Sequence, residues 1–123
     1  MALQHLIISF NERHVKRMRL GVTYPSVVSY VKDLDGTLIE QYDRQPIYVV
    51  DATGLGQPII NYLRQEIEPA RIKAVHITAA QQMHQQKHNL HVPKQQLVSM
   101  LILLLQTGRI HLPRTTDSFF WLF

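Results

Sequence analysis

Cysteine is absent from this chain of 123 residues. Disulfide bonds and metal sites built from thiolates are therefore excluded, and the composition fits a reducing compartment. The first residues, MALQHLIISFNERH, contain neither a basic segment ahead of an apolar core nor a small-residue cleavage site. We therefore expect no signal peptide and a cytoplasmic location.

Long apolar runs are also missing. A membrane-spanning helix needs roughly 20 consecutive apolar residues, and the longest run here, VSMLILLL at residues 98–105, is far shorter. We expect this segment to form a buried helix and no membrane span. Charge is only mildly unbalanced, since 13 Lys and Arg residues face 9 Asp and Glu residues and give a formal net charge of +4. Such a balance permits contact with nucleic acid without indicating it.

The chain does contain enough apolar material for one core. Hydrophobic residues make up 46% of it, and its length suits a single domain over residues 1–123. Segments that predict strands alternate with periodic segments that predict helices. Strands are expected at residues 3–10, 46–52, 71–78 and 109–113, residues 13–20 could form another, and helices are expected at 23–34, 57–67 and 94–107. This alternation predicts an α/β layer fold whose sheet is at least partly parallel.

Local signals refine the first expected helix. Thr23 or Ser26 can cap its N-terminus, and Pro25 suits a position in its first turn. The dipeptide Asp35-Gly36 is typical of a turn, so we expect the helix to end before it.

The remaining segments carry signals of the same kind. The β-branched run in PIYVVDA, residues 46–52, predicts a strand buried on both faces. The Gln- and His-rich stretch 79–91 predicts a loop or an exposed hairpin, and Gly108 predicts the end of the third helix. The second helix is expected to bury a stripe formed by Ile59, Ile60, Leu63 and Ile67.

One carboxylate stands at the end of the expected strand at 46–52. In YVVDATGLGQP, Asp51 is followed at once by a Gly-rich turn that leads into a helix. Ligands of α/β sheets gather at the carboxyl ends of strands, and a helix N-terminus favours a nearby anion. Two roles stay open: Asp51 is a metal-binding catalytic acid, or it is a polar residue that closes the turn at 53–56. The turn is neither a P-loop nor a complete dinucleotide-binding fingerprint.

Two further groups of side chains could bind ligands. His84, His88 and His91 would share one face of a helix, as metal ligands can, whereas an exposed polar loop would give them no common role. Basic side chains could hold a phosphate backbone or form an ordinary solvated surface. These are the basic residues of segment 13–19 together with Lys73, Lys87 and Lys94.

The apolar sequence FFWLF at residues 119–123 needs a surface to cover it. It can dock on the core of its own chain, meet a segment that this chain lacks, or join two copies of the chain in a homo-oligomer.

The order of the motifs resembles the C-terminal nuclease domain of phage and prophage terminase large subunits. VVDATGLGQPIINYLR, IKAVHIT and HVPKQQLVSMLILLLQTGRIHLP follow one another as in that family, and RMRLGVTYPSVVSYVKDL resembles the stretch before its Asp-bearing strand. The resemblance covers residues 13–113. It implies an RNase H-like fold, with helices flanking a mixed sheet, and metal-dependent endonucleolytic cutting of double-stranded DNA during genome packaging. It also implies a phage or prophage origin and a bacterial host cytoplasm.

The resemblance assigns roles to individual residues. Asp51 takes the position of the acid on the family's fourth strand, where it would be a catalytic ligand of Mg²⁺ or Mn²⁺. Thr53, Gly54 and Gly56 match the following turn, and Lys94 matches the Lys of a Val-Pro-Lys segment. These four residues would lie near DNA or its phosphates.

The chain also departs from the family. The family's first strand carries an essential Asp, but residues 3–10 match its second strand better and contain no acid. The family's last acids lie near a terminal helix, and the context of Asp117 does not match theirs. Ala79 and Ala80 stand where the family often has Gly. We therefore expect a partial nuclease domain without the first strand and the acidic helix, inactive by itself.

Two other interpretations stay open. An active nuclease could be completed by oligomerisation if other acids joined Asp51, the candidates being Glu12, Glu40, Asp43 and Asp117. The chain could instead be a non-enzymatic assembly or nucleic-acid-binding module that associates through its apolar C-terminus.

Overall fold

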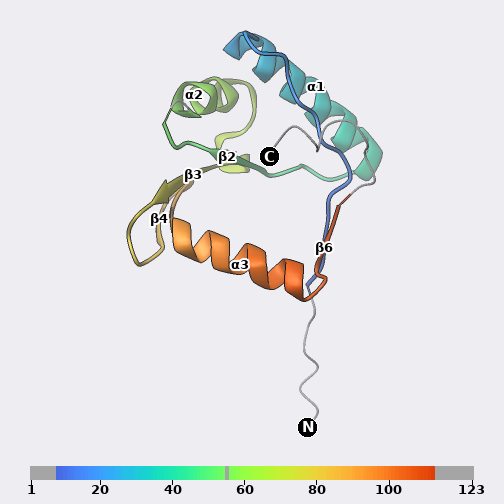
Figure 1. Cartoon of the computed structure of the whole chain (residues 1–123). Coiled ribbons are helices and arrows are strands. Elements are labelled where there is room, and N and C mark those ends of the chain that lie inside the picture. Colours follow the sequence, from blue (N-terminus) through green and yellow to red (C-terminus); the bar gives the residue numbers. More distant parts are fainter. Residues whose placement is uncertain (1–7, 55, 113–123) are drawn as a thin grey trace. The chain divides into compact units, whose positions relative to one another are not determined.

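The computed structural model describes residues 8–54 and 56–112, and the chain divides into two compact units. The larger unit is Leu20–Gln96, and the smaller one combines Met1–Arg19 with Leu97–Phe123. Figure 1 labels most of the helices and strands of both.

The larger unit is built around a mixed four-stranded sheet. Its elements are α1 (Tyr24–Tyr42), β2 (Tyr48–Asp51), α2 (Gly56–Glu66), a 3-10 turn η1 (Pro69–Arg71), β3 (Ile72–Thr78), β4 (His84–Gln86) and β5 (Asn89–Pro93). The strand order is β2-β3-β5-β4, in which β2, β3 and β5 run parallel and β4 runs antiparallel to β5. The predicted α/β class with a partly parallel sheet is thus confirmed.

The core lies between α1, α2 and one face of this sheet, with both helices on the same side (Figure 1). The predicted stripe of α2 provides much of it: Ile60, Leu63 and Ile67 are buried, and Ile59 packs against them. Ile72 and Ala74 of β3 face this stripe and are fully buried. The 3.6-residue period of α2 therefore places inside the residues that the sequence predicts.

Helix α1 begins as predicted and ends later. Thr23 is its N-cap, since the Thr23 hydroxyl accepts a hydrogen bond from the Ser26 N–H at 3.3 Å, and a proline follows in the first turn. The turn predicted at Asp35-Gly36 is wrong, because α1 continues through both residues to Tyr42. Asp35 is buried and bonded to side chains far along the chain, which overrides the local preference of the dipeptide.

Strand β2 is buried on one face only. Tyr48 and Val50 pack against the core, whereas Val49 is 69% exposed. The prediction of burial on both faces is therefore wrong. Because α1 and α2 lie on the same side of the sheet, the alternate residues of β2 face away from the core.

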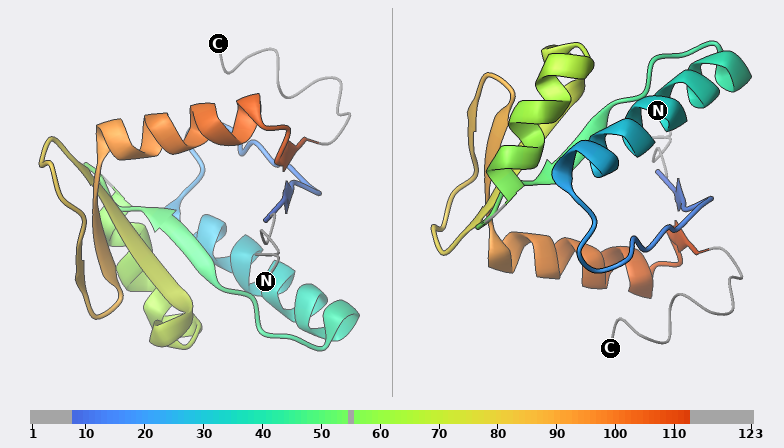
Figure 2. Two further views of the ribbon diagram at one scale, coloured as in Figure 1. Left: turned by 90° about the horizontal axis from the view of Figure 1, so that it is seen from below. Right: turned by 90° about the horizontal axis from the view of Figure 1, so that it is seen from above.

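The stretch 79–91 contains the exposed hairpin that the sequence allows. β4 and β5 pair antiparallel, with His84 opposite His91 and Gln86 opposite Asn89. Lys87 takes a positive φ of 50° at the turn between them. Figure 2 shows this hairpin extending the sheet beside β3 in both views.

The smaller unit contains a parallel pair of short strands, β1 (Phe10–Asn11) and β6 (Ile110–His111). The Arg109 guanidinium reinforces it by donating from Nε to the Ile8 carbonyl at 2.7 Å. The strand expected at 109–113 is thus present in part. Of the strand expected at 3–10, residue 10 begins β1, residues 8–9 are not in a strand, and residues 3–7 lie outside the described residues. No strand forms at 13–20, where the side chains are mostly exposed and pair with no neighbouring strand in the described part of the chain.

Helix α3 (Lys94–Gln106) begins in the larger unit and continues into the smaller one. Its start and its end before Gly108, which has a φ of 64°, agree with the prediction. The expected burial is wrong for the described chain: none of its residues is buried, and Leu101 is 51% exposed. None of the helices in the described ranges is long and apolar enough to cross a membrane.

Candidate functional site

Asp51 lies at the carboxyl end of β2, opposite Val75 in the middle of β3. Its side chain is exposed, and Oδ1 accepts a hydrogen bond from the Thr53 N–H at 2.8 Å. Hydrogen bonds from the Thr53 hydroxyl and N–H, helped by the nearby His76, lower the pKa of Asp51 below its ordinary value. Asp51 is therefore a solvent-facing carboxylate that is ionised at neutral pH.

The turn after Asp51 is tied to the neighbouring strand. The Thr53 hydroxyl accepts a hydrogen bond from the Ile77 N–H at 3.0 Å, and the Ala52 N–H donates to the Val75 carbonyl at 2.8 Å. Together these bonds fix the backbone that carries Asp51. A fixed backbone is a requirement for any site built on this carboxylate.

The two glycines of the turn have distinct structural reasons. Gly54 has a φ of 68°, which side-chain-bearing residues rarely adopt. Gly56, the first residue of α2, lies so close to β2 that a Cβ atom on it would be 2.1 Å from the Asp51 carbonyl oxygen. The backbone contact with Asp51 therefore explains Gly56, and its role near a phosphate stays a prediction.

The structure shows the turn-closing role considered for Asp51, and its role as a metal ligand stays a prediction. Asp51 closes the turn through Thr53, and its side chain is exposed at a strand end. In residues 8–54 and 56–112, no three His, Cys, Asp or Glu side chains are grouped so that they could hold a metal ion. Of the acids considered as companions, Glu40 and Asp43 belong to the same unit as Asp51, Glu12 belongs to the smaller unit, and Asp117 lies outside the described residues.

The structure brings together a different set of histidines from the one that the sequence suggests. His84, His88 and His91 do not share a helix face, because they lie on the β4–β5 hairpin. His88 instead approaches Lys73, with Nδ1 and Nζ 3.5 Å apart. His76 of β3 stacks on His91 with ring centroids 4.7 Å apart, and the His84 ring lies 6.0 Å from that of His91.

This row of three imidazoles follows the register of the sheet, since His76 and His84 are both paired with His91. Strand pairing is a long-range property, so the sequence shows His76 only as one more residue of an apolar strand. Stacked rings place their nitrogen atoms side by side and give no common point at which a metal would sit.

Lys94 is the first residue of α3 and directly follows β5. Since β2, β3 and β5 are parallel, Lys94 belongs to the same edge of the sheet as Asp51. The predicted turn and the predicted Lys therefore occupy one edge. Residues 119–123, predicted to mediate association, lie outside the described residues.

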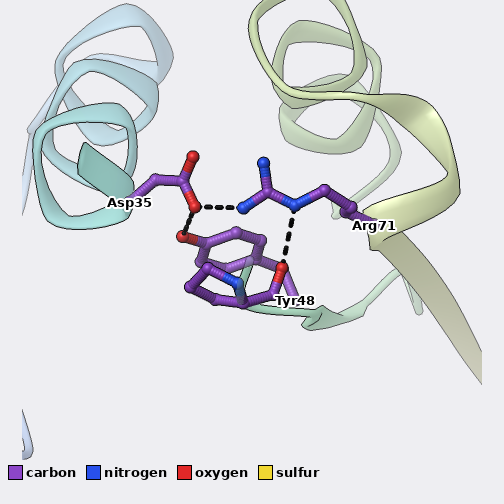
Figure 3. A network of polar contacts seen from close by, with 4 residues as sticks. Asp35, Tyr48 and Arg71 are labelled. Carbon is purple, nitrogen blue, oxygen red and sulfur yellow. Dashed lines mark hydrogen bonds and ion pairs between the residues drawn. The ribbon is translucent and has the colours of Figure 1, made fainter. Parts of the chain in front are cut away.

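A second polar cluster, unforeseen from the sequence, ties α1 to the sheet (Figure 3). Asp35 accepts hydrogen bonds from the Tyr48 hydroxyl, at 2.7 Å, and from the Arg71 guanidinium, which also donates to the Pro46 carbonyl at 3.0 Å. Burial opposes the charge of Asp35, yet the bonds from Arg71 and Tyr48 outweigh it and lower the pKa of Asp35. The cluster is closed by its own members, which favours a structural role.

Tyr48 makes the stability of the fold sensitive to alkaline pH. Burial and the bond to Asp35 raise the pKa of Tyr48 above its ordinary value of about 10. A raised pKa in the folded state gives stability that is complete below pH 10 and is lost as pH rises above it. We expect the free energy of unfolding to fall more steeply between about pH 10 and 11 in the wild type than in Tyr48→Phe, as measured by urea denaturation. Equal slopes in the two proteins would contradict this assignment.

Comparison of the chain with protein-family models, with curated proteins and with solved structures gave no match.

Proposed function

We propose that the chain is a nuclease-type domain related to terminase large subunits, RNase H-like in fold, in which Asp51 is one ligand of a divalent-metal site for DNA cleavage. The observation that carries the proposal is the position of Asp51. It is an exposed, ionised carboxylate at the carboxyl end of a parallel strand, on a backbone fixed by hydrogen bonds. Ligand sites of α/β sheets lie at such strand ends.

The order of elements supports the same proposal. The motifs that resemble the family fall on β2 and its turn, on α2, on β3 and on α3, in that order. The motifs that carry the resemblance therefore coincide with strands and helices of the larger unit and with the helix that follows it. The mixed sheet, with helices packed against it, supports the proposal at the level of the α/β class.

The chemistry of the site limits what the chain can do alone. Mg²⁺ and Mn²⁺ prefer oxygen ligands, and when bound in pairs they activate a water and stabilise the leaving oxygen of a phosphodiester. Asp51 would supply one such oxygen, and a single carboxylate does not hold two ions. We therefore propose that the chain binds metal weakly and does not cut DNA unless further carboxylates are supplied.

A non-enzymatic assembly module is the second candidate function. The observation that favours it is the surface of α3, whose large apolar side chains are exposed in the described chain: Leu97, Val98, Met100, Leu101, Ile102, Leu103 and Leu105. Side chains of this kind are common where two protein surfaces meet.

Asp51→Asn should abolish the binding of Mn²⁺ at millimolar concentration, measured by water-proton relaxation or calorimetry. Asn removes the charge and keeps an oxygen that can accept from Thr53, so the turn is preserved. Asp43→Asn is the matched control, because Asp43 is another exposed acid and its φ of 52° is one that Asn tolerates. The control should bind Mn²⁺ as the wild type does, and none of the three proteins should cleave plasmid DNA.

The outcomes separate the two candidate functions. Equal Mn²⁺ binding by the wild type and Asp51→Asn would leave Asp51 with only its structural role, and self-association by light scattering would then favour the assembly module. Strong cleavage that Asp51→Asn abolishes would show instead that the chain assembles a complete nuclease site.

A further inference from the structure

A cavity of about 300 Å³ opens at the carboxyl ends of β3 and β5. These strands end at Thr78 and Pro93, which are paired with each other. The lining residues all belong to the larger unit and are Thr78, Ala79, Ala80, Gln81, Lys94 and Gln95. The cavity therefore lies on the same edge of the sheet as Asp51, in a fold class that binds ligands at this edge.

The lining of the cavity suits an anion. Lys94 supplies a positive charge, Gln81 and Gln95 supply amide donors, and no lining residue is acidic. In the described part of the chain, the Lys94 side chain forms neither an ion pair nor a hydrogen bond. Its ammonium group is thus available to a ligand, in contrast to that of Lys32, which pairs with Glu66 at 2.8 Å.

Thr78 provides the second, independent observation. Its hydroxyl oxygen is buried and has no hydrogen-bond partner among the described residues, although its residue lines the cavity. A buried hydroxyl without a partner is destabilising, and such groups in native proteins call for an explanation. An oxygen of a bound anion would accept from this hydroxyl and remove the penalty.

The start of α3 adds to these two groups. The N–H groups in the first turn of a helix have no partner within the helix, and a side-chain oxygen just before the helix often accepts from them. Pro93 precedes α3 and has no such oxygen. A negatively charged ligand beside Lys94 and Gln95 would meet the positive end of this helix.

We propose that this cavity binds a phosphate group, with the Lys94 ammonium and the Thr78 hydroxyl as its donors. The phosphate can come from a nucleic-acid backbone or from a small phosphate. The first source deepens the proposed function, since a phosphate here would place a DNA strand along the edge that carries Asp51. That part of the inference rests on the proposed function. Binding at the cavity itself requires no metal.

The test is a titration of the ¹⁵N-labelled chain by NMR in EDTA, first with inorganic phosphate and then with a short DNA duplex. Saturable shifts are expected for the amides of residues 78–81 and 94–96. Lys94→Gln should weaken phosphate binding about tenfold, as expected for a charged hydrogen bond. Thr78→Val, which keeps the shape of the side chain, should weaken it about threefold and leave the thermal midpoint unchanged or higher.

Lys87→Gln is the matched control, because Lys87 is an exposed lysine on the β4–β5 turn and its removal changes the net charge equally. Equal weakening by Lys87→Gln and Lys94→Gln would overturn the proposal, as would wild-type affinity in Thr78→Val or the absence of saturable shifts. Shifts with the duplex that inorganic phosphate displaces would support a backbone phosphate, and shifts with inorganic phosphate alone would support a small phosphate. Because EDTA removes divalent metals, these outcomes are independent of Mn²⁺ binding at Asp51.

Discussion

Asp35→Ala is expected to lower the free energy of unfolding by about 3 kcal/mol. The side chains of Arg71 and Asp35 are only 11% and 12% exposed and form an ion pair. Without the carboxylate, the buried Arg71 guanidinium would still donate to the Pro46 carbonyl at 3.0 Å but would have no opposite charge beside it. The Tyr48 hydroxyl would lose the acceptor of its hydrogen bond. Breaking a buried pair costs about 3–5 kcal/mol, and the bond to Pro46 places the expectation at the lower end. Urea denaturation followed by circular dichroism measures the loss.

Two comparisons make this expectation specific. Lys32→Ala breaks the ion pair between Lys32 and Glu66, whose side chains are 59% and 46% exposed, and should cost far less stability than Asp35→Ala, because solvent screens an exposed pair. The double variant Asp35→Leu with Arg71→Met removes both buried charges and should recover most of the stability, because no charge remains buried without a partner. A loss in Asp35→Ala no larger than in Lys32→Ala would mean that the cluster does not hold α1 to the sheet.

The same cluster shows where sequence patterns stop being informative. The Asp35-Gly36 dipeptide predicts a turn from its two residues alone, and the structure has a helix there. What decides is the burial of Asp35 against Tyr48 and Arg71, which are 13 and 36 residues away along the chain. Arg71 and Tyr48 each look unremarkable in their own segments, so no local pattern announces their meeting.

Elements whose signals are local were predictable. The Thr23 cap depends on residues three positions apart, and the buried stripe of α2 depends on one helical period. The β4–β5 hairpin likewise follows from one short polar stretch. Burial of an apolar segment is different, because it depends on what lies opposite. The sequence therefore predicts α3 as a helix but misplaces its side chains, and it misses the exposure of Val49.

The candidate site divides in the same way. Asp51 and its turn could be found from the sequence, since a strand, an acid and a Gly-rich turn follow one another. The cavity beside Thr78 could not, because Lys94 reaches it only through the parallel pairing of β3 with β5. The stacking of His76 on His91 has the same origin. Residues of one strand are predictable, and partners from neighbouring strands require the register.

Gly56→Ala is expected to destabilise the fold by about 3 kcal/mol and to disturb Asp51 directly. A Cβ atom at position 56 would lie 2.1 Å from the Asp51 carbonyl oxygen and 3.0 Å from its carbonyl carbon. Both are backbone atoms, so no side-chain rotation can relieve the overlap, and α2 must move away from β2. Urea denaturation measures the loss of stability, and Mn²⁺ binding measures the displacement of the carboxylate.

Two other glycines serve as controls, because each isolates one effect of adding a methyl group. Gly36→Ala lies within α1, where a Cβ atom meets nothing within 4 Å, so it should stabilise the fold by about 1 kcal/mol through helix propensity. Gly54→Ala also meets nothing within 4 Å but has a φ of 68°, and the strained backbone should cost about 1–2 kcal/mol. If Gly56→Ala proved as mild as Gly54→Ala, α2 would be free to shift against β2. The backbone that holds Asp51 would then be too loose for a metal site. Asp51 would be better described as a polar residue that closes the turn than as a metal ligand.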